Sequence, residues 1–319
     1  MLNMSISTVS RALKDHQDIS PETIAKVKEL AVTLDYIPNA YAISLRTNNS
    51  KEFGVIVPSI SGNFYHSFIS SIEEEARRYG YSVIILQSGD DPQIELENIR
   101  KCKNARVSGI FLSINSSARD ISEVLKLDQL NIPVIFFDKV PDYDACNKVC
   151  TADAKATELA AALLLSKDKK RIIAMFGNQQ MSITQVRLRA FNDFMKAHQA
   201  EEFFEVVHAL SPAEASSQLT IAFNNKIKPD AVFCMSDEIL TGVMKTVQML
   251  KIKVPEKLGI VAISDGYIPQ LYYPEITYAE TSGFKLGKLA FSRMMACISG
   301  TPFVQTIVDE SVLVFGGSI

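Results

Sequence analysis

A run of small polar side chains followed by an arginine stands near the start of the chain. Ser5 is placed to cap the N-terminus of a short helix, which leaves Ile6, Ser7 and Ser10 near the helix start and Arg11 one turn further on. Small polar groups and an arginine at a helix start can reach base edges in the major groove of DNA, where arginine forms two hydrogen bonds with guanine. The same residues are also typical of any capped amphipathic helix.

A second helix start follows at residues 18–23. Ser20 is a candidate N-cap, and Pro21 occupies the first helical position. Apolar side chains then recur at helical spacing at Ile24, Val27, Leu30, Ala31 and Leu34. Pro38 prevents the helix from continuing. We therefore predict two short helices followed by a non-helical connection.

These helices and residues 35–46 together resemble the headpiece and hinge of the LacI/GalR family of transcription regulators. The resemblance implies that Ser5, Ile6, Ser7, Ser10 and Arg11 belong to the recognition helix of a helix-turn-helix. It extends over nearly the whole chain. It implies an effector-responsive protein that binds double-stranded operator DNA as a homodimer.

The resemblance also assigns roles to residues outside the recognition helix. Leu45 occupies the position of a leucine that wedges into the minor groove, where the cost of unstacking is offset by bending the duplex. Alternatively, Leu45 is a linker residue that packs on the core. Ser20, Thr23 and Asn39 would donate to phosphates and fix the register without reading sequence. A helix-capping role is the alternative for these three, and both roles can coexist.

The N-terminus departs from the family pattern. Family members begin with a further helix before the equivalent of Leu2 and Asn3, and that helix forms one side of a small three-helix core. Losing about three apolar side chains removes roughly 5–9 kcal/mol, whereas a fifty-residue unit has only about 3–8 kcal/mol to lose. We therefore expect that this headpiece does not fold alone and that about ten residues precede Met1. The alternative is a truncated protein that senses its effector without binding operators tightly.

From Phe53 onward the chain alternates between apolar strands and helices. The predicted strands cover residues 53–58, 81–86, 109–112, 134–137, 171–175, 231–234 and 258–262. Near-continuous apolar strands separated by helices of ten to fifteen residues indicate parallel sheets that are covered on both faces. The number of strands favours two similar lobes. The predicted fold class is α/β, with two doubly wound parallel sheets after a partial all-α headpiece.

The resemblance identifies these lobes with a periplasmic-binding-protein-like core. The headpiece is expected at residues 1–38, the hinge helix and linker at 39–51, and the effector-binding and dimerisation core at 52–319. Crossings between the lobes are expected near Val149-Cys150, Ala279-Glu280 and Pro302-Phe303. The first lobe would then comprise about 52–149 and 281–302, and the second about 150–280 and 303–319.

An effector would bind in the cleft near the carboxyl ends of the strands. By resemblance, Phe64 and Tyr65 offer aromatic faces to a sugar or purine ring, although both could be core aromatics. Asp138, after the strand at 134–137, could accept ligand hydroxyls or pair with Lys139 or another neighbour.

Further expected effector contacts come from the second half of the chain. Arg187 matches a ligand-contacting arginine, whose fork suits vicinal hydroxyls or a carboxylate, with a helix-surface salt bridge as the alternative. Ser236 replaces an asparagine of the family pattern and Asp237 retains its aspartate. Asp265 remains beside a position where the family often has another aspartate, and Tyr267 is a candidate cleft wall. The residues at the positions that select the ligand differ from the family pattern. The effector is therefore expected to be sugar-like, but its identity is not carried over from known regulators.

Composition limits the remaining possibilities. The chain has 319 residues, 47% of them hydrophobic and 22% charged, with a net charge of −3. This charge gives no global attraction to nucleic acid, so DNA contacts must come from local placement of charge. The five cysteines at irregular spacing match neither a disulfide framework nor a zinc pattern. We see no signal segment or membrane span and expect a cytoplasmic protein without cofactor or metal.

Two other function classes are compatible with parts of the predicted fold. A solute-binding protein that feeds a transporter is compatible with the core, but it should carry a secretory signal. An enzyme on a doubly wound fold would need a phosphate loop or catalytic cluster, and residues 177–180 lack the spacing of a nucleotide fingerprint. The prediction is therefore a transcriptional regulator, a repressor, and not an enzyme.

Overall fold

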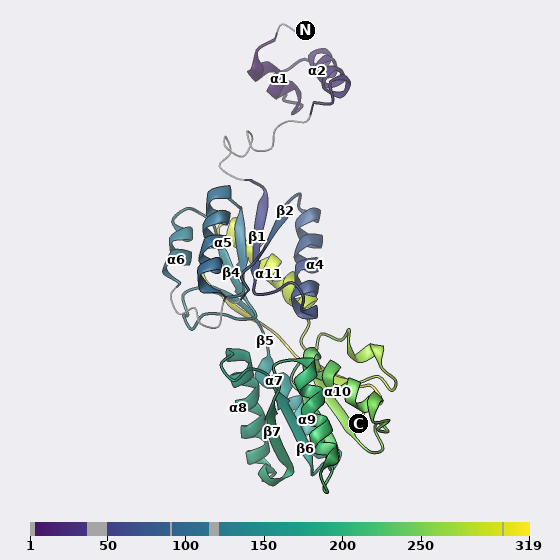
Figure 1. Cartoon of the computed structure of the whole chain (residues 1–319). Helices are drawn as coiled ribbons and strands as arrows, with labels where there is room; N and C mark the ends of the chain where they lie inside the picture. The colour runs from purple at the N-terminus through teal and green to yellow at the C-terminus, as the bar shows by residue number, and fades with distance from the viewer. Residues whose placement is uncertain (1–3, 37–49, 90, 115–120, 302) are drawn as a thin grey trace. The chain divides into compact units, whose positions relative to one another are not determined.

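The computed structural model describes residues 4–36, 50–89, 91–114, 121–301 and 303–319. These residues form two units, Met1–Ser50 and Lys51–Ile319, which are described separately. Figure 1 shows the helical N-terminal unit and the larger unit, in which two sheets each carry their own helices.

The N-terminal unit contains two described helices, α1 (Ile6–Ala12) and α2 (Pro21–Thr33). The predicted caps are confirmed, since Ser5 accepts a hydrogen bond from the Thr8 amide and Ser20 accepts one from the Thr23 amide. Within residues 4–36 only Ala12 and Val27 are buried. This unit therefore has a very small apolar core.

The first sheet of the larger unit has the strand order β11-β5-β4-β3-β1-β2, and all its strand pairs are parallel. Its strands are β1 (Glu52–Val57), β2 (Ser82–Gln87), β3 (Gly109–Leu112), β4 (Val134–Phe137), β5 (Asn147–Thr151) and β11 (Thr306–Asp309). The helices are α4 (Asn63–Arg78), α5 (Pro92–Ala105), α6 (Ser122–Asp128) and α11 (Gly283–Ile298). Separate apolar clusters lie under α4 and α11 and under α5 and α6, so both faces of the sheet are covered.

The second sheet has the order β12-β10-β9-β8-β6-β7, with only β12 antiparallel. Its strands are β6 (Ile172–Phe176), β7 (Phe204–His208), β8 (Ala231–Cys234), β9 (Gly259–Ser264), β10 (Thr277–Glu280) and β12 (Leu313–Val314). The helices are α7 (Asp153–Ser166), α8 (Ser182–Ala197), α9 (Pro212–Asn224), α10 (Asp237–Met249) and the short η1 (Glu201–Phe203) and η2 (Pro269–Leu271). The strand order reverses at β6, so right-handed connections place α8 on one face and α9 and α10 on the other.

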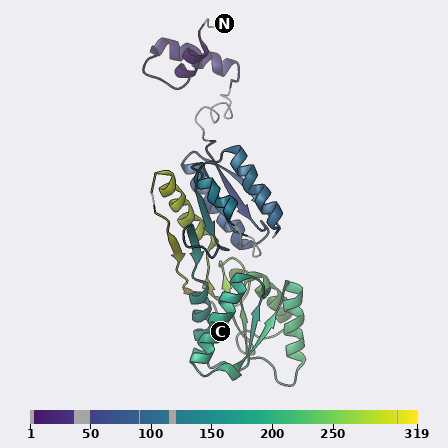
Figure 2. The ribbon, with the colours of Figure 1, turned by 90° about the vertical axis from the view of Figure 1, so that its left-hand side faces the viewer.

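The chain passes between the lobes three times, and the last passage differs from the prediction. It leaves the first sheet after β5, returns after β10 and leaves again after β11. Because β11 pairs with β5, the final crossing follows Asp309 and not Pro302-Phe303. Residues 306–309 therefore belong to the first lobe, contrary to the expected boundary. Figure 2 shows the connections between the two lobes from a second direction.

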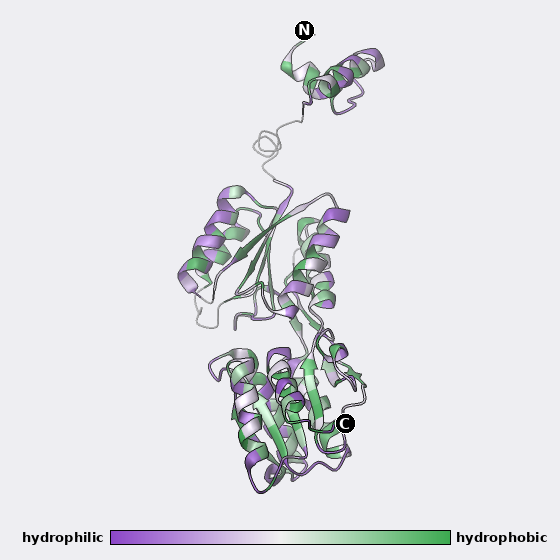
Figure 3. Cartoon of the chain, turned by 45° about the vertical axis from the view of Figure 1, so that its right-hand side comes forward, coloured by the Kyte–Doolittle hydropathy of each residue, from purple (hydrophilic) through white to green (hydrophobic). Residues whose placement is uncertain are grey.

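Apolar strands hold each lobe together. Figure 3 shows that the strands are hydrophobic along most of their length, whereas the helices carry both hydrophobic and hydrophilic positions. In the first lobe Phe68 of α4 stacks on Phe137 of β4, with ring centroids 3.6 Å apart.

No described helix is long and apolar enough to cross a membrane. All five cysteines are free, and Cys102, Cys146 and Cys234 are buried.

Glycines in α11 let this helix approach α4 closely. A Cβ at Gly283 would lie 2.2 Å from the Phe64 carbonyl oxygen, and one at Gly287 would lie 2.7 Å from the Ser71 Cβ. Any side chain at these positions would push the two helices apart. The contact fixes the first turn of α4, which contributes to the site described next.

Candidate functional site

A pocket of about 450 Å³ lies where the carboxyl ends of strands from both sheets meet. Residues that directly follow seven strands line it, namely Pro58, Asp138, Gly177, Ala209, Met235, Asp265 and Thr281. The starts of α4, α8, α9 and α10 also contribute lining residues. Its volume and its position at the ends of the strands are typical of ligand sites in α/β proteins.

Seven of the eight residues predicted to bind effector line this pocket. They are Phe64, Tyr65, Asp138, Arg187, Ser236, Asp237 and Asp265. Tyr267 is not among the lining residues, and 62% of its surface is exposed. The backbone turns at Gly266, which has a φ of +100°. The assignment of Tyr267 to the cleft wall therefore gains no support from this pocket and stays a prediction.

Asp138 and Tyr65 form a polar pair on the first-lobe side of the pocket. The Tyr65 hydroxyl donates to Asp138 at 2.5 Å and also lies 3.3 Å from the Ser113 hydroxyl. Burial raises the pKa of Asp138 to about 6, although the Tyr65 hydrogen bond opposes this rise. Lys139 follows Asp138 and also lines the pocket. Tyr65 is thus fixed by a hydrogen bond and is not a simple core aromatic.

Arg187 is buried at the base of the pocket, with 7% of its side chain exposed. Its Nε donates to Asp153 at 2.9 Å, and a terminal nitrogen donates to the Met235 carbonyl oxygen. The helix-surface salt bridge that was the alternative for Arg187 is therefore not what forms. Asp153 begins α7 just after the chain enters the second lobe. No sequence motif identified Asp153, because only the fold brings it to Arg187.

Asp237 and Asp265 lie side by side through the loop that ends β9. The Ser264 hydroxyl donates to one Asp237 carboxylate oxygen, and the Asp265 amide approaches the other at 3.5 Å. Burial raises the pKa of Asp237 to about 6, opposed by the Ser264 hydrogen bond. The Ser264 side chain thus connects the end of β9 to the start of α10, a role that the sequence analysis did not assign to it.

Ser236 and Ser67 connect this loop to neighbouring elements. Ser236 caps α10, since its side chain accepts from the Ile239 amide. The Ser67 hydroxyl of α4 donates to Asp265 at 3.3 Å, which joins the first lobe to the second at the mouth of the pocket. The Ser67–Asp265 hydrogen bond therefore depends on the angle between the lobes.

The predicted DNA-contacting residues occupy the N-terminal unit. Ile6 is 90% exposed, and Ser7 and Arg11 are also exposed on α1, whereas Ser10 is half-buried. Arg11 lies 3.9 Å from Asp18, a contact between two exposed groups. The side chains of Ser5 and Ser20 serve as helix caps, and the Ser20 hydroxyl donates to the Thr23 hydroxyl. Asn39 and Leu45 lie outside the described residues.

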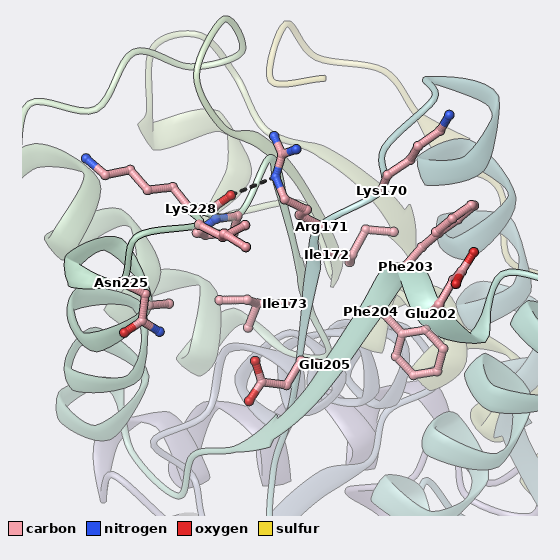
Figure 4. Close-up of a pocket in the computed structure, with 13 residues that line it drawn as sticks. Lys170, Arg171, Ile172, Ile173, Glu202, Phe203, Phe204, Glu205, Asn225 and Lys228 are labelled. Atoms are coloured by element: carbon pink, nitrogen blue, oxygen red, sulfur yellow. Dashed lines mark hydrogen bonds between the residues drawn. The ribbon is translucent and has the colours of Figure 1, made fainter.

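A second, smaller pocket of about 290 Å³ lies at the amino ends of β6 and β7 (Figure 4). Lys170, Arg171 and Lys228 surround an apolar floor that includes Ile173, and Arg171 Nε donates to the Lys228 carbonyl oxygen at 2.9 Å. It lies at the opposite ends of the strands from the first pocket.

Across the described parts of the chain, no group of three or more His, Cys, Asp or Glu side chains could hold a metal ion.

Two family models match the chain. Residues 50–310 match the model described as periplasmic binding proteins and sugar binding domain of the LacI family. Residues 3–39 match the model of bacterial regulatory proteins of the lacI family. The first match covers more than half of the chain, so the protein belongs to the LacI family of bacterial regulatory proteins.

Individual relatives agree with this membership. Catabolite control protein A of Staphylococcus epidermidis is 28% identical over 86% of this chain and 83% of its own length. The ribose operon repressor of Bacillus subtilis is 27% identical over 98% of this chain and 94% of its own. A crystal structure of the lac repressor dimer bound to operator and the anti-inducer ONPF superposes with a TM-score of 0.87 at 21% identity, covering 99% and 96% of the two chains. At this identity the superposition shows the shared fold.

Proposed function

We propose that this protein is a cytoplasmic transcriptional repressor whose affinity for operator DNA is controlled by a sugar or related metabolite in the cleft between its lobes. The observation that carries the proposal is the presence of two features in one chain. One is a capped, exposed helix that bears Arg11, and the other is a core with a polar pocket between two sheets. The relatives named as repressors support it. Binding and conformational change are sufficient for this role, and it requires no catalytic step.

On the DNA side, α1 would enter the major groove. Arg11 would pair with a guanine, and Ile6 and Ser7 would contact neighbouring base edges. Ser20, Thr23 and Asn39 would bind phosphates and set the register, and Leu45 would wedge into the minor groove. On the effector side, Asp138 and Arg187 would bind ligand hydroxyls and Asp237 another polar ligand group, with Phe64 against an apolar ligand face.

Coupling between the two sides would run through the angle between the lobes. Ser67 and Asp265 hydrogen-bond across the mouth of the pocket, so a ligand that contacts both lobes changes the free energy of closure. A changed closure angle repositions the start of β1, which directly follows residues 39–51. The separation of two hinge segments in a dimer would then depend on the effector.

A dimer fits both the operator and the surface of the core. A single small headpiece buries too little surface to be specific, and dimers read two half-sites. Apolar side chains of Ile60, Ile69, Ile85 and Phe284 line a groove over α4 and the edge strand β2. Ile60 and Ile85 are each about half exposed, which is typical of side chains that a partner subunit covers.

The direct test is selection of DNA from a random pool by the full-length protein, followed by anisotropy titrations with and without candidate metabolites. We expect selective binding that at least one sugar-like compound changes. Arg11→Ala should reduce discrimination between selected and random duplexes by ~1–3 kcal/mol, whereas Lys14→Ala serves as an exposed control on the same turn. An equal loss on every sequence would mark Arg11 as a phosphate contact. Absence of any preferred duplex, with and without metabolites, would refute the proposal.

A further inference from the structure

The pocket between the lobes contains more acidic than basic side chains. Four carboxylates line it, from Asp138, Asp237, Glu238 and Asp265, against the two cations Lys139 and Arg187. Asp153 adds a fifth carboxylate behind the lining through its ion pair with Arg187. The charge of the site is therefore negative before any ligand enters.

One of these two cations, Arg187, is already engaged. Two nitrogens of Arg187 donate to the same Asp153 oxygen, and the third donates to the Met235 carbonyl oxygen. An anionic ligand at Arg187 would have to compete with Asp153, a carboxylate that the fold holds in place. The N–H groups left on Arg187 suit a neutral acceptor such as a hydroxyl.

Two helix starts oppose this negative charge without cancelling it. α4 and α8 begin at the pocket, and neither N-terminus is capped by a side chain. Each helix end carries the equivalent of roughly +0.5 charge, so the two together offset about one carboxylate. α10 adds little, because Asp237 and Glu238 already occupy its first turn.

The carboxylates are not evenly spread. Asp237, at the start of α10, accepts from the Asp265 backbone amide just after β9 at 3.5 Å, whereas Asp138 lies in the first lobe with Tyr65. Two neighbouring carboxylates disfavour each other's ionised form, and a cation between them relieves this repulsion. Burial is the largest cause of the raised pKa of Asp237, and repulsion from the Asp265 carboxylate raises it further.

We propose, on the basis of the function proposed above, that this pocket selects its effector by charge. A polyhydroxylated compound that carries an amino group binds best, with its ammonium against Asp237 and Asp265 and its hydroxyls toward Asp138 and Arg187. The uncharged counterpart binds more weakly. Phosphorylated and carboxylated counterparts are excluded, because their charge would be buried against fixed carboxylates.

Matched sets of sugars test this selection. In each set the parent sugar is compared with its amino, uronate and phosphate derivatives, beginning with glucose, glucosamine, glucuronate and glucose 6-phosphate and continuing through galactose, mannose and ribose series. Thermal shift and calorimetric titration of the full-length protein at pH 7.5 provide the readouts. In a set that binds, we expect the amino derivative to bind at least fivefold more tightly than the parent and neither anion to stabilise the protein.

Asp265→Asn separates charge from shape, because the amide oxygen can still accept from the Tyr267 amide and the amide NH2 can donate to the Ser67 hydroxyl. This variant should lower affinity for the amino derivative at least fivefold and for the parent sugar less than twofold. Asp193→Asn, an exposed change in the second half of α8, serves as the control and should alter neither affinity. Equal losses for both ligands in Asp265→Asn would overturn the placement of the ammonium.

The outcomes distinguish this inference from the proposed function. If an anionic derivative binds more tightly than its parent, charge selection is overturned while effector control remains intact. If no member of any set binds and no metabolite changes operator affinity, the effector part of the proposed function fails as well.

Discussion

The N-terminal unit and the core of this protein are stabilised in different ways. Within residues 4–36, Ala12 and Val27 are the only buried residues, and the two helices depend on the caps at Ser5 and Ser20. The core buries nine phenylalanines almost completely, in apolar clusters on the two lobes. The difference implies a reading unit that gains order on its target and a sensor whose individual lobes are folded before ligand binds.

The largest expected effect is a core truncation that leaves the N-terminal unit unchanged. Phe233→Ala removes a fully buried ring on β8 and should lower the free energy of unfolding of the core by ~3–5 kcal/mol. Val27→Ala in α2 should leave the main unfolding transition unchanged. Scanning calorimetry of both variants measures this difference. A shift of the main transition by Val27→Ala as large as that from Phe233→Ala would show that the two units unfold as one.

The buried ion pair of the core should contribute more to the free energy of unfolding than the exposed ion pair of the N-terminal unit. Arg187→Met leaves Asp153 buried without its partner and should destabilise the core by ~3–5 kcal/mol, and Asp153→Asn in the same chain should recover much of this loss. In the N-terminal unit, Asp18→Asn removes the exposed contact with Arg11 and should cost less than ~1 kcal/mol. Urea denaturation measures both. Failure of the second substitution to rescue Arg187→Met would argue against a coupled pair.

The core should also gain stability on mild acidification. The pKa values of Asp138 and Asp237 are raised to about 6 in the folded protein, so protonation favours the folded state. Their stabilising contribution is present at low pH and is lost as pH rises through about 6. Asp237→Asn should therefore stabilise the core by roughly 1–3 kcal/mol at pH 7.5 and by about a third as much at pH 4.5. Equal effects at both pH values, measured by urea denaturation, would contradict the raised pKa.

The smallest expected effect concerns a helix cap in the N-terminal unit. Ser20→Ala removes the acceptor for the Thr23 amide and should cost ~1 kcal/mol, whereas Ser20→Gly should cost only a few tenths. Hydrogen exchange of the α2 amides is the appropriate measurement, because the core transition should not respond. Equal exchange in both variants and the parent protein would mean that packing, and not the cap, maintains α2.

Sequence reasoning was accurate for the buried central strands and incomplete at the sheet edges. The predicted strands at residues 109–112 and 134–137 coincide with β3 and β4, whose residues are all buried. It missed β5, β7, β10, β11 and β12, several of which mix polar with apolar residues because they lie toward a sheet edge. The last lobe crossing, which the resemblance placed near Pro302-Phe303, follows β11 instead.

The sequence by itself determined the helix starts at Ser5 and Ser20, the buried strands and the two-lobed class, because capping hydrogen bonds and apolar periodicity are local properties. Only the tertiary structure decided that Arg187 pairs with Asp153, that Asp237 lies against Asp265, and that Tyr267 is exposed and does not line the pocket. The physical reason is that these relations depend on which strand ends meet, and contacts between residues far apart in the chain leave no spacing pattern in the sequence.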